Sequence, residues 1–472
     1  MALRRPRRYA GGLPSASGGT RSHSRGSGRC SPQLKPPAAG IASRSHAATV
    51  RRHLFGGPGM PSSLDSLVAA YDAAAPLERA CTPPAAWYTD PRVAELERAA
   101  VFARSWQLVA RLDQLTQPGC FVTANIAGEP VVVVRGRDQK LRAFYNVCRH
   151  HAAEVVTAAE GKSHNLRCPY HGWTYSLEGA LRGCPEFSEV RDFDQARNGL
   201  SPVALDTWEQ FVFVRLSNGG PSLREHVGSM AERVALLRLS ALKFYARRTY
   251  DLKCNWKVFV DNYLDGGYHV PHIHKGLNSV LDYQEYRIET ADRYCLQSSP
   301  ITSAGGEAET ASVRGGQTAY YYWLYPNLML NWYEGYLDTN LVLPLDVDHC
   351  RVIFDFYFAD ADPESQPGAA GPHKDRSETG TTSTAGAAVP HQDGSKIRPT
   401  SQAERCRSVA VAERVQQEDI DICESVQRGL GSRSYDVGRL SVRREAGEHL
   451  FHRLLAADLR AALQHENPVN NL

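Results

Sequence analysis

Four potential metal ligands in two short segments constrain this chain more than any other feature of its 472 residues. The segment NVCRHH contains Cys148 and His150, and the segment CPYHGW contains Cys168 and His171. Each segment lies near strand-like sequence and beside Arg, Pro or Gly, a pattern typical of tight turns. Thiolate and imidazole groups bind zinc, iron and iron–sulfur clusters. The sequence therefore predicts a metal centre held by two turns, each contributing one Cys and one His.

The mixed pairing separates two kinds of site. Zinc fingers usually place both cysteines in one segment and both histidines in the other. A mixed pairing suits a two-iron cluster in which two thiolates hold one iron and two imidazoles hold the other. It therefore favours one Rieske [2Fe-2S] cluster bound by Cys148, His150, Cys168 and His171. His151 is not expected to be a ligand, because consecutive side chains point apart.

A second candidate metal site lies in the run VDNYLDGGYHVPHIHKGL. His269 and His274 are five residues apart, so a continuous helix would point them in different directions. They can face one ion only if the helix breaks between them, and Pro271 stands where a break is expected. His272 would share the face of His269 if the helix continued, so spacing alone leaves the second ligand open.

A carboxylate ligand is expected in the run SVAVAERVQQEDIDICESVQRGL. Its apolar residues recur at helical spacing, and Asp419 falls within that stripe between Val415 and Ile422. A buried acid is unfavourable unless it is paired or bound to metal. Asp421 lies about 200° away around the helix, on the side expected to be solvated. Asp419 is therefore the predicted ligand, and two histidines with one carboxylate are typical of non-haem iron(II) sites that activate oxygen.

These motifs resemble those of the Rieske non-haem iron oxygenases, over roughly residues 85–360 and 405–455. The segment CRHHA…CPYHGWTY resembles the family's cluster motif, and H-x4-H resembles its iron motif. The resemblance thus favours His269 and His274, with Asp419, as ligands of one mononuclear non-haem Fe(II).

Four runs are similar to the plant choline monooxygenase subfamily: NWKVFVDNYLDGGYHVPHIHK, YPNLMLNWY, DTNLVLPL and EDIDICESVQRGL. This resemblance implies oxidation of choline by O2 to betaine aldehyde hydrate, the first step of glycine betaine synthesis. Reduced ferredoxin would supply the electrons. One alternative is a Rieske oxygenase that acts on another quaternary ammonium compound, such as carnitine or glycine betaine. A less favoured one is a Rieske electron-transfer protein.

One position departs from the wider family. Most members have an acid three residues before the first iron histidine, where it relays electrons from a neighbouring subunit. Here that position is Gly266, which leaves three alternatives: a catalytic relay through Asp265, one through Asp261, or no relay residue at all. By the same resemblance, the protein is expected to be a homo-oligomer, a trimer or a multiple of one, that passes electrons between subunits.

A quaternary ammonium substrate calls for aromatic side chains, because cation–π attraction contributes about 0.5 to 2 kcal/mol per ring. The run AYYYWLYPNLMLNWYEGY supplies many such rings. Trp332 and Tyr325 are the substrate contacts predicted from it.

The pattern of expected elements predicts an α+β protein. Short strands divided by turns indicate an N-terminal all-β Rieske domain over residues 104–220. Mixed helices and strands indicate a larger α+β catalytic domain over 221–460, with an antiparallel sheet beside the mononuclear iron. A helical segment over 62–103 precedes both domains, and a tail over 461–472 follows them. Residues 362–404 are rich in Gly, Pro, Ser and Thr and are expected to be a disordered insertion.

The first acidic residue of the chain is Asp65, and the basic, Ser-rich segment before it is typical of an organelle transit peptide. With the resemblance, a transit peptide over residues 1–61 implies the chloroplast stroma, the mitochondrion being the alternative. The net charge of +3 gives no indication of nucleic acid binding. No apolar run is long enough to span a membrane, so no membrane partner is expected.

Overall fold

The computed structural model describes residues 63–302, 307–359 and 400–466. The expected transit peptide and most of the expected insertion lie outside these residues. Two expected boundaries change. The long helix α10 begins at Gln402, inside the expected insertion, with Ser401 as its N-cap. The last helix runs to Glu466, past the start of the expected tail.

Short helices open the described chain. Asp90 caps α3 by accepting a hydrogen bond from the N–H of Arg92 at 2.9 Å, and Pro91 occupies the first helical position. Trp87 and Val101 of this segment share one core with Phe451 of the last helix. The N-terminal segment therefore packs into the catalytic domain. Its elements are α1 (Leu64–Ala69), α2 (Ala86–Thr89), α3 (Pro91–Glu97) and the π-helix η1 (Arg98–Phe102).

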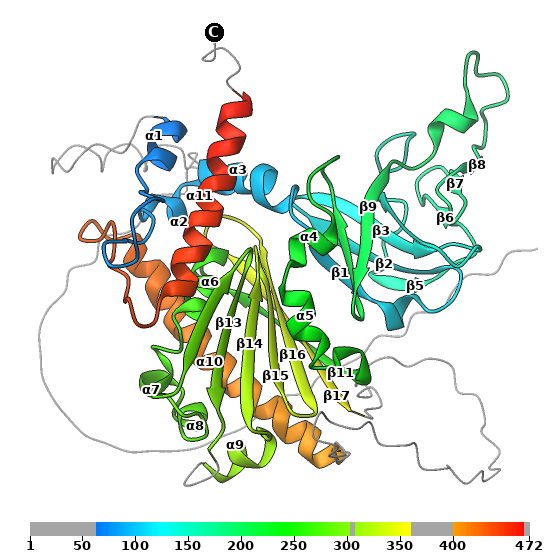
Figure 1. Ribbon diagram of the computed structural model, residues 1–472. Helices are drawn as coiled ribbons and strands as arrows, with labels where there is room; N and C mark the ends of the chain where they lie inside the picture. The colour runs from blue at the N-terminus through cyan, green and yellow to red at the C-terminus, as the bar shows by residue number, and fades with distance from the viewer. Residues whose placement is uncertain (1–62, 303–306, 360–399, 467–472) are drawn as a thin grey trace, which may run out of the picture. The chain divides into compact units, whose positions relative to one another are not determined.

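The Rieske domain contains a seven-stranded antiparallel sheet in the order β1-β10-β9-β4-β3-β2-β5 and a small sheet β6-β7-β8 (Figure 1). The run VVVV in β3 is buried on both faces. Val131 and Val133 join one core, whereas Val132 and Val134 join another that also contains Cys148. The strands are β1 (Gln107–Arg111), β2 (Cys120–Ile126), β3 (Glu129–Arg135), β4 (Leu141–Tyr145), β5 (Glu160–Lys162), β6 (Leu166–Arg167), β7 (Thr174–Tyr175), β8 (Leu181–Gly183), β9 (Pro202–Trp208) and β10 (Phe211–Arg215). Short 3-10 helices are η2 (Leu112–Leu115) and η3 (Gln195–Asn198).

A second seven-stranded antiparallel sheet forms the catalytic domain, in the order β11-β17-β16-β15-β14-β13-β12. The long helix α10 lies across this sheet (Figure 1). The strands are β11 (Leu242–Leu252), β12 (Arg287–Ala291), β13 (Tyr294–Pro300), β14 (Thr318–Leu324), β15 (Leu328–Tyr333), β16 (Tyr336–Pro344) and β17 (Cys350–Ala359). The helices are α4 (Leu223–Val227), α5 (Met230–Ala235), η4 (Leu239–Ala241), α6 (Trp256–Leu264), α7 (Val270–Ile273), α8 (Lys275–Asn278), α9 (Ala308–Val313), α10 (Gln402–Leu430) and α11 (Ala446–Glu466).

Alternation along β15 gives this sheet two different faces. Leu330 and Trp332 pack into an apolar core with Phe211 and Phe213 of β10. Asn331, between them in sequence, points to the other face. The predicted fold class, a β-rich Rieske domain followed by an α+β catalytic domain, is confirmed.

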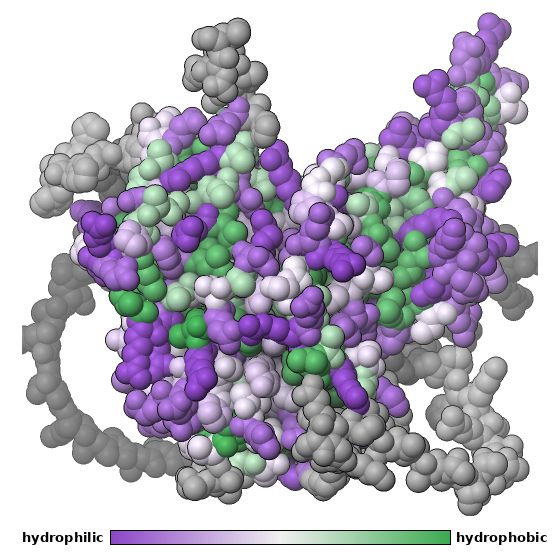
Figure 2. Space-filling model, in the orientation of Figure 1, coloured by the Kyte–Doolittle hydropathy of each residue, from purple (hydrophilic) through white to green (hydrophobic). Residues whose placement is uncertain are grey.

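The tip of the Rieske domain around β8 is mostly hydrophilic on the face shown in Figure 2. Across the described ranges, every helix is too short or too polar to cross a bilayer.

Candidate metal centres

The two Cys–His segments form similar closed loops at one end of the Rieske domain. In the first, the N–H of Cys148 donates to the carbonyl of Ala153 at 2.8 Å. In the second, the N–H of Cys168 donates to the carbonyl of Trp173 at the same distance. The first loop follows β4, and the second joins β6 to β7. The two loops thus present one Cys and one His each, as predicted.

The four side chains suit a Rieske cluster in their chemistry. Cys148 and Cys168 are buried, whereas His171 is exposed. The rings of His150 and His171 lie 4.8 Å apart, and Nδ1 of His150 is buried without a hydrogen-bond partner among the described residues. Two buried thiols and two neighbouring imidazoles, one of them exposed, fit a two-iron cluster whose histidine side is the one nearer to solvent.

Polar groups surround the thiols. The Tyr175 hydroxyl lies 3.3 Å from the sulfur of Cys148 and accepts a hydrogen bond from the N–H of Arg149 at 3.0 Å. Burial raises the pKa of the Cys168 thiol, while the backbone N–H groups of Tyr170 and His171 oppose that rise. Hydrogen bonds of this kind adjust the reduction potential of a bound cluster. Tyr175 lies outside the ligand motif and was not predicted as a site residue.

The predicted orientation of His151 is wrong. Its ring lies only 4.1 Å from that of His150, so the two consecutive side chains do not point apart. Strand alternation does not apply here because both residues lie in a turn, which continues to Ala152 with a positive φ of 58°. The exclusion of His151 as a ligand stays a prediction.

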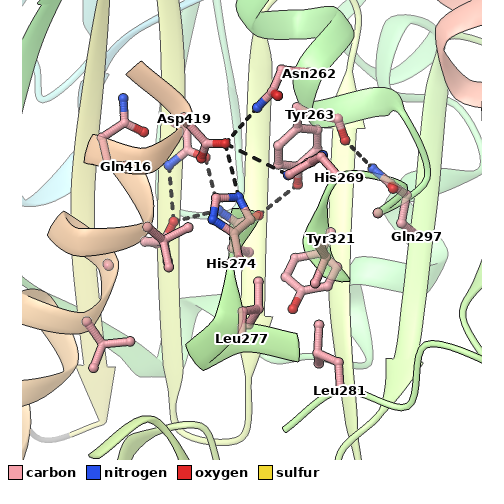
Figure 3. Close-up of a pocket in the computed structure, with 18 of the residues that line it drawn as sticks. Asn262, Tyr263, His269, His274, Leu277, Leu281, Gln297, Tyr321, Gln416 and Asp419 are labelled. Carbon is pink, nitrogen blue, oxygen red and sulfur yellow. Dashed lines mark hydrogen bonds and ion pairs between the residues drawn. The ribbon is translucent and has the colours of Figure 1, made fainter. Parts of the chain in front are cut away.

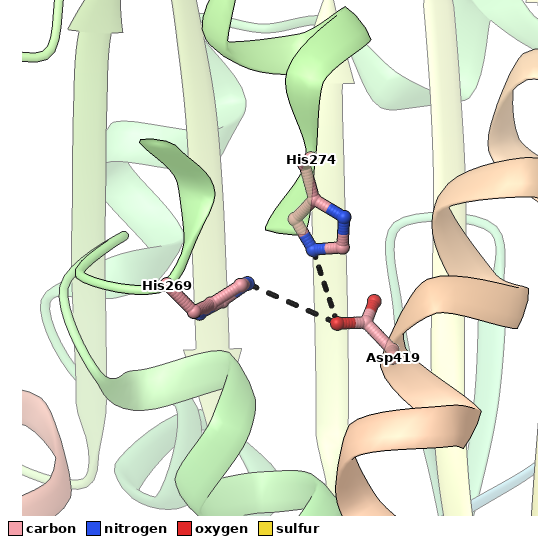
Figure 4. A group of neighbouring side chains, drawn as sticks. All are labelled: His269, His274 and Asp419. Atoms are coloured by element: carbon pink, nitrogen blue, oxygen red, sulfur yellow. Dashed lines mark hydrogen bonds and ion pairs between the residues drawn. The ribbon is translucent and has the colours of Figure 1, made fainter. Parts of the chain in front are cut away.

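In the catalytic domain, His269, His274 and Asp419 come together (Figure 4). Oδ1 of Asp419 lies 3.1 Å from Nε2 of His274 and 3.8 Å from Nε2 of His269. One ligand atom from each residue lies within 4.8 Å of the other two. The two imidazole rings are 4.8 Å apart and nearly perpendicular, at 81°. Three such donors converging on one point fit a single metal ion of the non-haem iron type.

The local fold explains how the histidines converge. After α6, Gly266 and Gly267 turn the chain with φ values of 69° and 68°, which favour glycine. His269 is the N-cap of the short helix α7, and His274 is its C-cap with non-helical angles. Pro271 lies within the first turn of α7, so the expectation of a break at Pro271 is wrong. The chain leaves the helix at His274 instead.

Neighbouring acids orient both histidines. Oδ2 of Asp265 lies 2.6 Å from Nδ1 of His269, and Oε2 of Glu418 lies 2.7 Å from Nδ1 of His274. The Asn262 amide donates to Oδ1 of Asp419 at 2.7 Å. Contacts of this kind fix the direction of a ligand ring and increase its basicity. Glu418 and Asn262 were not predicted, although the position of Glu418 beside Asp419 is a signal that could have been used.

The two alternative ligands lie elsewhere. His272 is exposed and is not among the residues that line the cavity beside the triad. Asp421 is exposed on α10, where it accepts a hydrogen bond from Gln417 at 2.9 Å. The burial argument for Asp419 therefore agrees with the structure, although Val426 of the same stripe is 44% exposed.

Comparisons with known proteins agree with both centres. Residues 105–194 match the Rieske [2Fe-2S] domain family, and residues 239–461 match the catalytic domain of the ring hydroxylating alpha subunit family. The chain is a Rieske oxygenase. As a member of that family it uses a Rieske [2Fe-2S] cluster and a mononuclear iron, and the two groups of donors described above fit them.

Relatives and solved structures span most of this Rieske oxygenase. It is 37% identical to the chloroplastic choline monooxygenase of Arabidopsis thaliana, over 84% of this chain and 88% of that protein. It is 31% identical to the carnitine monooxygenase oxygenase subunit of Escherichia coli, over 80% of this chain and 94% of that protein. The structure of a quaternary ammonium Rieske monooxygenase with L-carnitine superposes with a TM-score of 0.66 at 27% identity, covering 84% of this chain and 99% of that one. These relatives support a monooxygenase.

Beside the triad of this Rieske oxygenase lies a cavity of about 120 Å³ (Figure 3). The triad itself forms part of the wall. Burial raises the pKa of each tyrosine in the lining, so the rings are neutral phenols at physiological pH. The four tyrosines are Tyr263, Tyr286, Tyr321 and Tyr333.

Trp332 and Tyr325 do not line this cavity, which corrects the predicted substrate contacts. Trp332 points to the opposite face of β15, where it packs in the apolar core with Leu330. Tyr325 is fully buried elsewhere and donates its hydroxyl hydrogen bond to Asp458 at 2.8 Å. The same aromatic segment does reach this cavity, but through Tyr321 and Tyr333, which lie on the other face of the sheet.

Asp261, the second relay candidate, belongs to a separate buried group. It accepts a hydrogen bond from the Tyr88 hydroxyl at 2.7 Å and lies 2.9 Å from Nε2 of His452. Glu448 lies 3.9 Å from the same nitrogen. Both Asp261 and Asp265 line a second cavity of about 220 Å³. Of the two candidates, Asp265 is the one that contacts an iron-site histidine, whereas Asp261 contacts Tyr88 and His452.

Proposed function

We propose that this Rieske oxygenase is a ferredoxin-dependent choline monooxygenase. It would convert choline, O2, two electrons and two protons into betaine aldehyde hydrate and water. The plant relative named choline monooxygenase supports this proposal, because the chain resembles it over most of both lengths. The bacterial relatives named for carnitine support the broader class of quaternary ammonium substrates.

The observation that carries the proposal is the cavity of tyrosines directly beside the triad. Tyr263, Tyr286, Tyr321 and Tyr333 surround a space that His269, His274 and Asp419 also line. The face of an aromatic ring attracts a cation, so a space surrounded by several rings suits a trimethylammonium group. A substrate held by these rings would have its reacting carbon beside the iron site.

In this proposal His269, His274 and Asp419 hold the mononuclear iron, which when bound supplies the activation of O2. Asp265 and Glu418 hold the two imidazoles in the tautomer that leaves each Nε2 free to bind the ion. Cys148, His150, Cys168 and His171 hold the Rieske cluster.

Asp265 is the proposed relay residue. It contacts His269 directly and also lines the second cavity, so it lies between the iron site and that cavity. Asp261 is held by Tyr88 and His452 and is proposed to support this region rather than to carry electrons. The proposed assembly is a homo-oligomer in which a neighbouring subunit's cluster supplies the electrons. Inter-subunit electron transfer has been described for a solved quaternary ammonium Rieske monooxygenase that is 25% identical to this chain.

The proposed location is the chloroplast stroma. The plant relatives are named as chloroplastic, and the segment of this chain before Asp65 is basic and contains no acidic residue. Reduced ferredoxin, the proposed electron donor, is consistent with that compartment.

The test is turnover by purified protein reconstituted with iron and sulfide. With ferredoxin, a ferredoxin reductase, NADPH and O2, choline should yield betaine aldehyde, detected by mass spectrometry. The variant His269→Ala should retain the Rieske spectrum and lose product formation. Absence of betaine aldehyde from protein with full iron content would contradict the proposal.

A second candidate substrate class is favoured by one observation. Arg314 is buried and lines the same cavity, and a guanidinium is well suited to bind a carboxylate. Carnitine and glycine betaine carry both a quaternary ammonium and a carboxylate. Product analysis with choline, carnitine and glycine betaine under identical conditions separates the two classes.

A further inference from the structure

Asp338 is a buried carboxylate that faces the tyrosine cavity from β16. It is 5% exposed. Its Oδ2 accepts a hydrogen bond from the Tyr336 hydroxyl at 2.6 Å. Its Oδ1 accepts hydrogen bonds from the side-chain amides of Asn331 at 2.6 Å and Asn340 at 3.1 Å. Three neutral donors therefore fix both oxygens in place.

The negative charge of Asp338 has no close cation in the described part of the chain. No nitrogen of Arg, Lys or His there lies within 4.0 Å of its oxygens. Burial raises the pKa of Asp338, whereas the hydrogen bonds from Tyr336 and Asn331 and the more distant Arg314 oppose that rise. A buried carboxylate is unfavourable until a positive charge reaches it. Asp338 lines the tyrosine cavity, so a small cation bound in that cavity would supply the missing positive charge.

A second buried polar group faces the cavity from another wall. Gln416 of α10 is 1% exposed and lines the cavity, and both its amide nitrogen and its amide oxygen lack a hydrogen-bond partner among the described residues. Figure 3 shows Gln416 on the α10 side, whereas Asp338 belongs to the sheet. A buried amide without partners is unfavourable by about 1–3 kcal/mol, so a ligand that pairs with it gains affinity.

We propose that Asp338 and Gln416 make the cavity selective for a small cation that carries a hydroxyl group. Asp338 supplies the countercharge for the ammonium group, and Gln416 pairs with the hydroxyl. A hydroxyl both donates and accepts, so it can satisfy the amide oxygen and the amide nitrogen. A carboxylate only accepts, and it would leave the amide oxygen of Gln416 without a donor. The inference rests on the proposed function and deepens it.

A guanidinium in the same cavity, that of Arg314, would favour a substrate with a carboxylate if it were available to bind one. This guanidinium already has partners, since Nη1 donates to the Ser408 hydroxyl at 2.7 Å. It also lies over the rings of Tyr333 and Tyr336, at 5.0 and 4.5 Å. These contacts indicate that Arg314 holds α10 against the sheet. If a carboxylate were instead its ligand, carnitine or glycine betaine would bind more tightly than choline, and this would overturn the inference.

Binding to the reconstituted protein without O2 and without a reductant tests the inference separately from turnover. Isothermal titration calorimetry compares choline with its neutral carbon analogue, in which a tert-butyl group replaces the trimethylammonium group. Asp338→Asn should weaken choline binding by roughly 10- to 100-fold and change binding of the analogue by less than about threefold. The matched control is Asp346→Asn, which removes one exposed carboxylate from a loop outside the cavity.

The second variant pair tests the hydroxyl end. Gln416→Leu should reduce the preference for choline over ethyltrimethylammonium by about tenfold, because that cation lacks the hydroxyl. Gln417→Leu, on the exposed face of the same helix, should leave the preference unchanged.

The outcomes distinguish this inference from the proposed function. If Asp338→Asn does not fold, the wild-type protein still decides, because equal affinities for choline and its neutral analogue would overturn the role of Asp338. Selective choline binding without turnover would contradict the proposed function and leave the inference standing. Turnover of choline together with unchanged binding in both variants would support the proposed function and overturn the inference.

Discussion

Asp265 Oδ2 lies 2.6 Å from Nδ1 of His269 and also accepts a hydrogen bond from the His269 backbone N–H at 3.0 Å. The two contacts hold the imidazole in one orientation, with Nε2 directed toward Asp419. A single acid at the end of α6 thus links the direction of an iron-site ring to the turn that follows the helix.

Replacing this acid should weaken iron binding without unfolding the domain. Asp265→Asn keeps the shape but provides a weaker acceptor for the His269 N–H, so we expect iron affinity or turnover to fall by roughly 10- to 100-fold. Iron content after dialysis against a graded chelator series measures the effect. The exposed Asp421→Asn serves as the control, and a wild-type affinity for iron in Asp265→Asn would refute the orienting role.

Asp419 should be needed for the mononuclear iron alone. Asp419→Ala removes one of three converging donors, so the protein should retain the two irons of the cluster and lose the third. Iron analysis and electron paramagnetic resonance of the dithionite-reduced protein measure the two centres independently. Asp421→Ala on the same helix should retain all three irons. Loss of the Rieske signal in Asp419→Ala would show that the two centres depend on each other for folding.

The buried thiols should be needed for the cluster alone. Cys168→Ser replaces a strong thiolate ligand, and we expect loss of the Rieske absorption and of its resonance signal. His151→Ala is the informative companion, because its ring lies 4.1 Å from His150. A full Rieske spectrum in His151→Ala would confirm that His151 is not a ligand, and a changed spectrum would reopen the assignment of the imidazole ligands.

Both metal centres could be predicted from sequence because their donors are unusual residues at fixed spacing. Cys148 and Cys168 would be out of place in tight turns without a metal, and Asp419 interrupts an apolar stripe. The exact turn that brings His269 and His274 together could not be predicted. It depends on Gly266, Gly267 and the helix end at His274 rather than on the proline between the histidines.

The lining of the tyrosine cavity was harder to predict, and β15 shows why. Consecutive residues of a strand point to opposite faces, so Trp332 and Tyr333 cannot line the same space. The sequence shows aromatic residues at both positions and gives no local sign of which face meets the iron site. Asp338 offered a usable signal that was missed. An acid inside the strand-like run YLDTNLVLPL is expected to be buried, and a buried acid needs hydrogen-bond donors or a positive charge as partners.

The stability of the protein should depend on pH through Glu448. Burial raises the pKa of this carboxyl well above its usual range, and the charges of Asp261 and Glu445 raise it further. In the unfolded chain the group ionises near its ordinary pKa, so the unfolded state loses its proton first as pH rises. The stabilising contribution is therefore complete below that ordinary pKa and is lost as pH rises toward the raised value in the folded state.

Glu448→Gln should accordingly lose less stability than the wild type between about pH 5 and about pH 8, because the amide has no proton to lose in this range. Thermal unfolding across a series of buffers measures the difference. Glu95→Gln, at an exposed position on α3, should follow the wild-type curve. Parallel curves for wild type and Glu448→Gln would mean that Glu448 does not control this dependence.

Gly266 occupies the position at which the resemblance to the wider family predicts a relay acid, and its backbone conformation explains why an acid does not fit there. Its φ is 69°, and a Cβ there would overlap the backbone carbonyl of Arg444. Any side chain would need both a left-handed conformation and displacement of that segment. We expect Gly266→Ala to lower the free energy of unfolding by about 2 kcal/mol or more.

Gly266→Asp should be at least as destabilising, so restoring the acid of the wider family would not restore a relay. Urea unfolding measures both variants. Gly429→Ala, in the last turn of α10 with open space around the added Cβ, is the matched control and should change stability by no more than about 1 kcal/mol. If Gly266→Asp folded with wild-type stability and transferred electrons faster, the relay position would be the same as in the wider family. If the substitution destabilises the fold, as the overlap with the Arg444 carbonyl predicts, the neighbouring acid that remains as the relay candidate is Asp265, which already contacts His269.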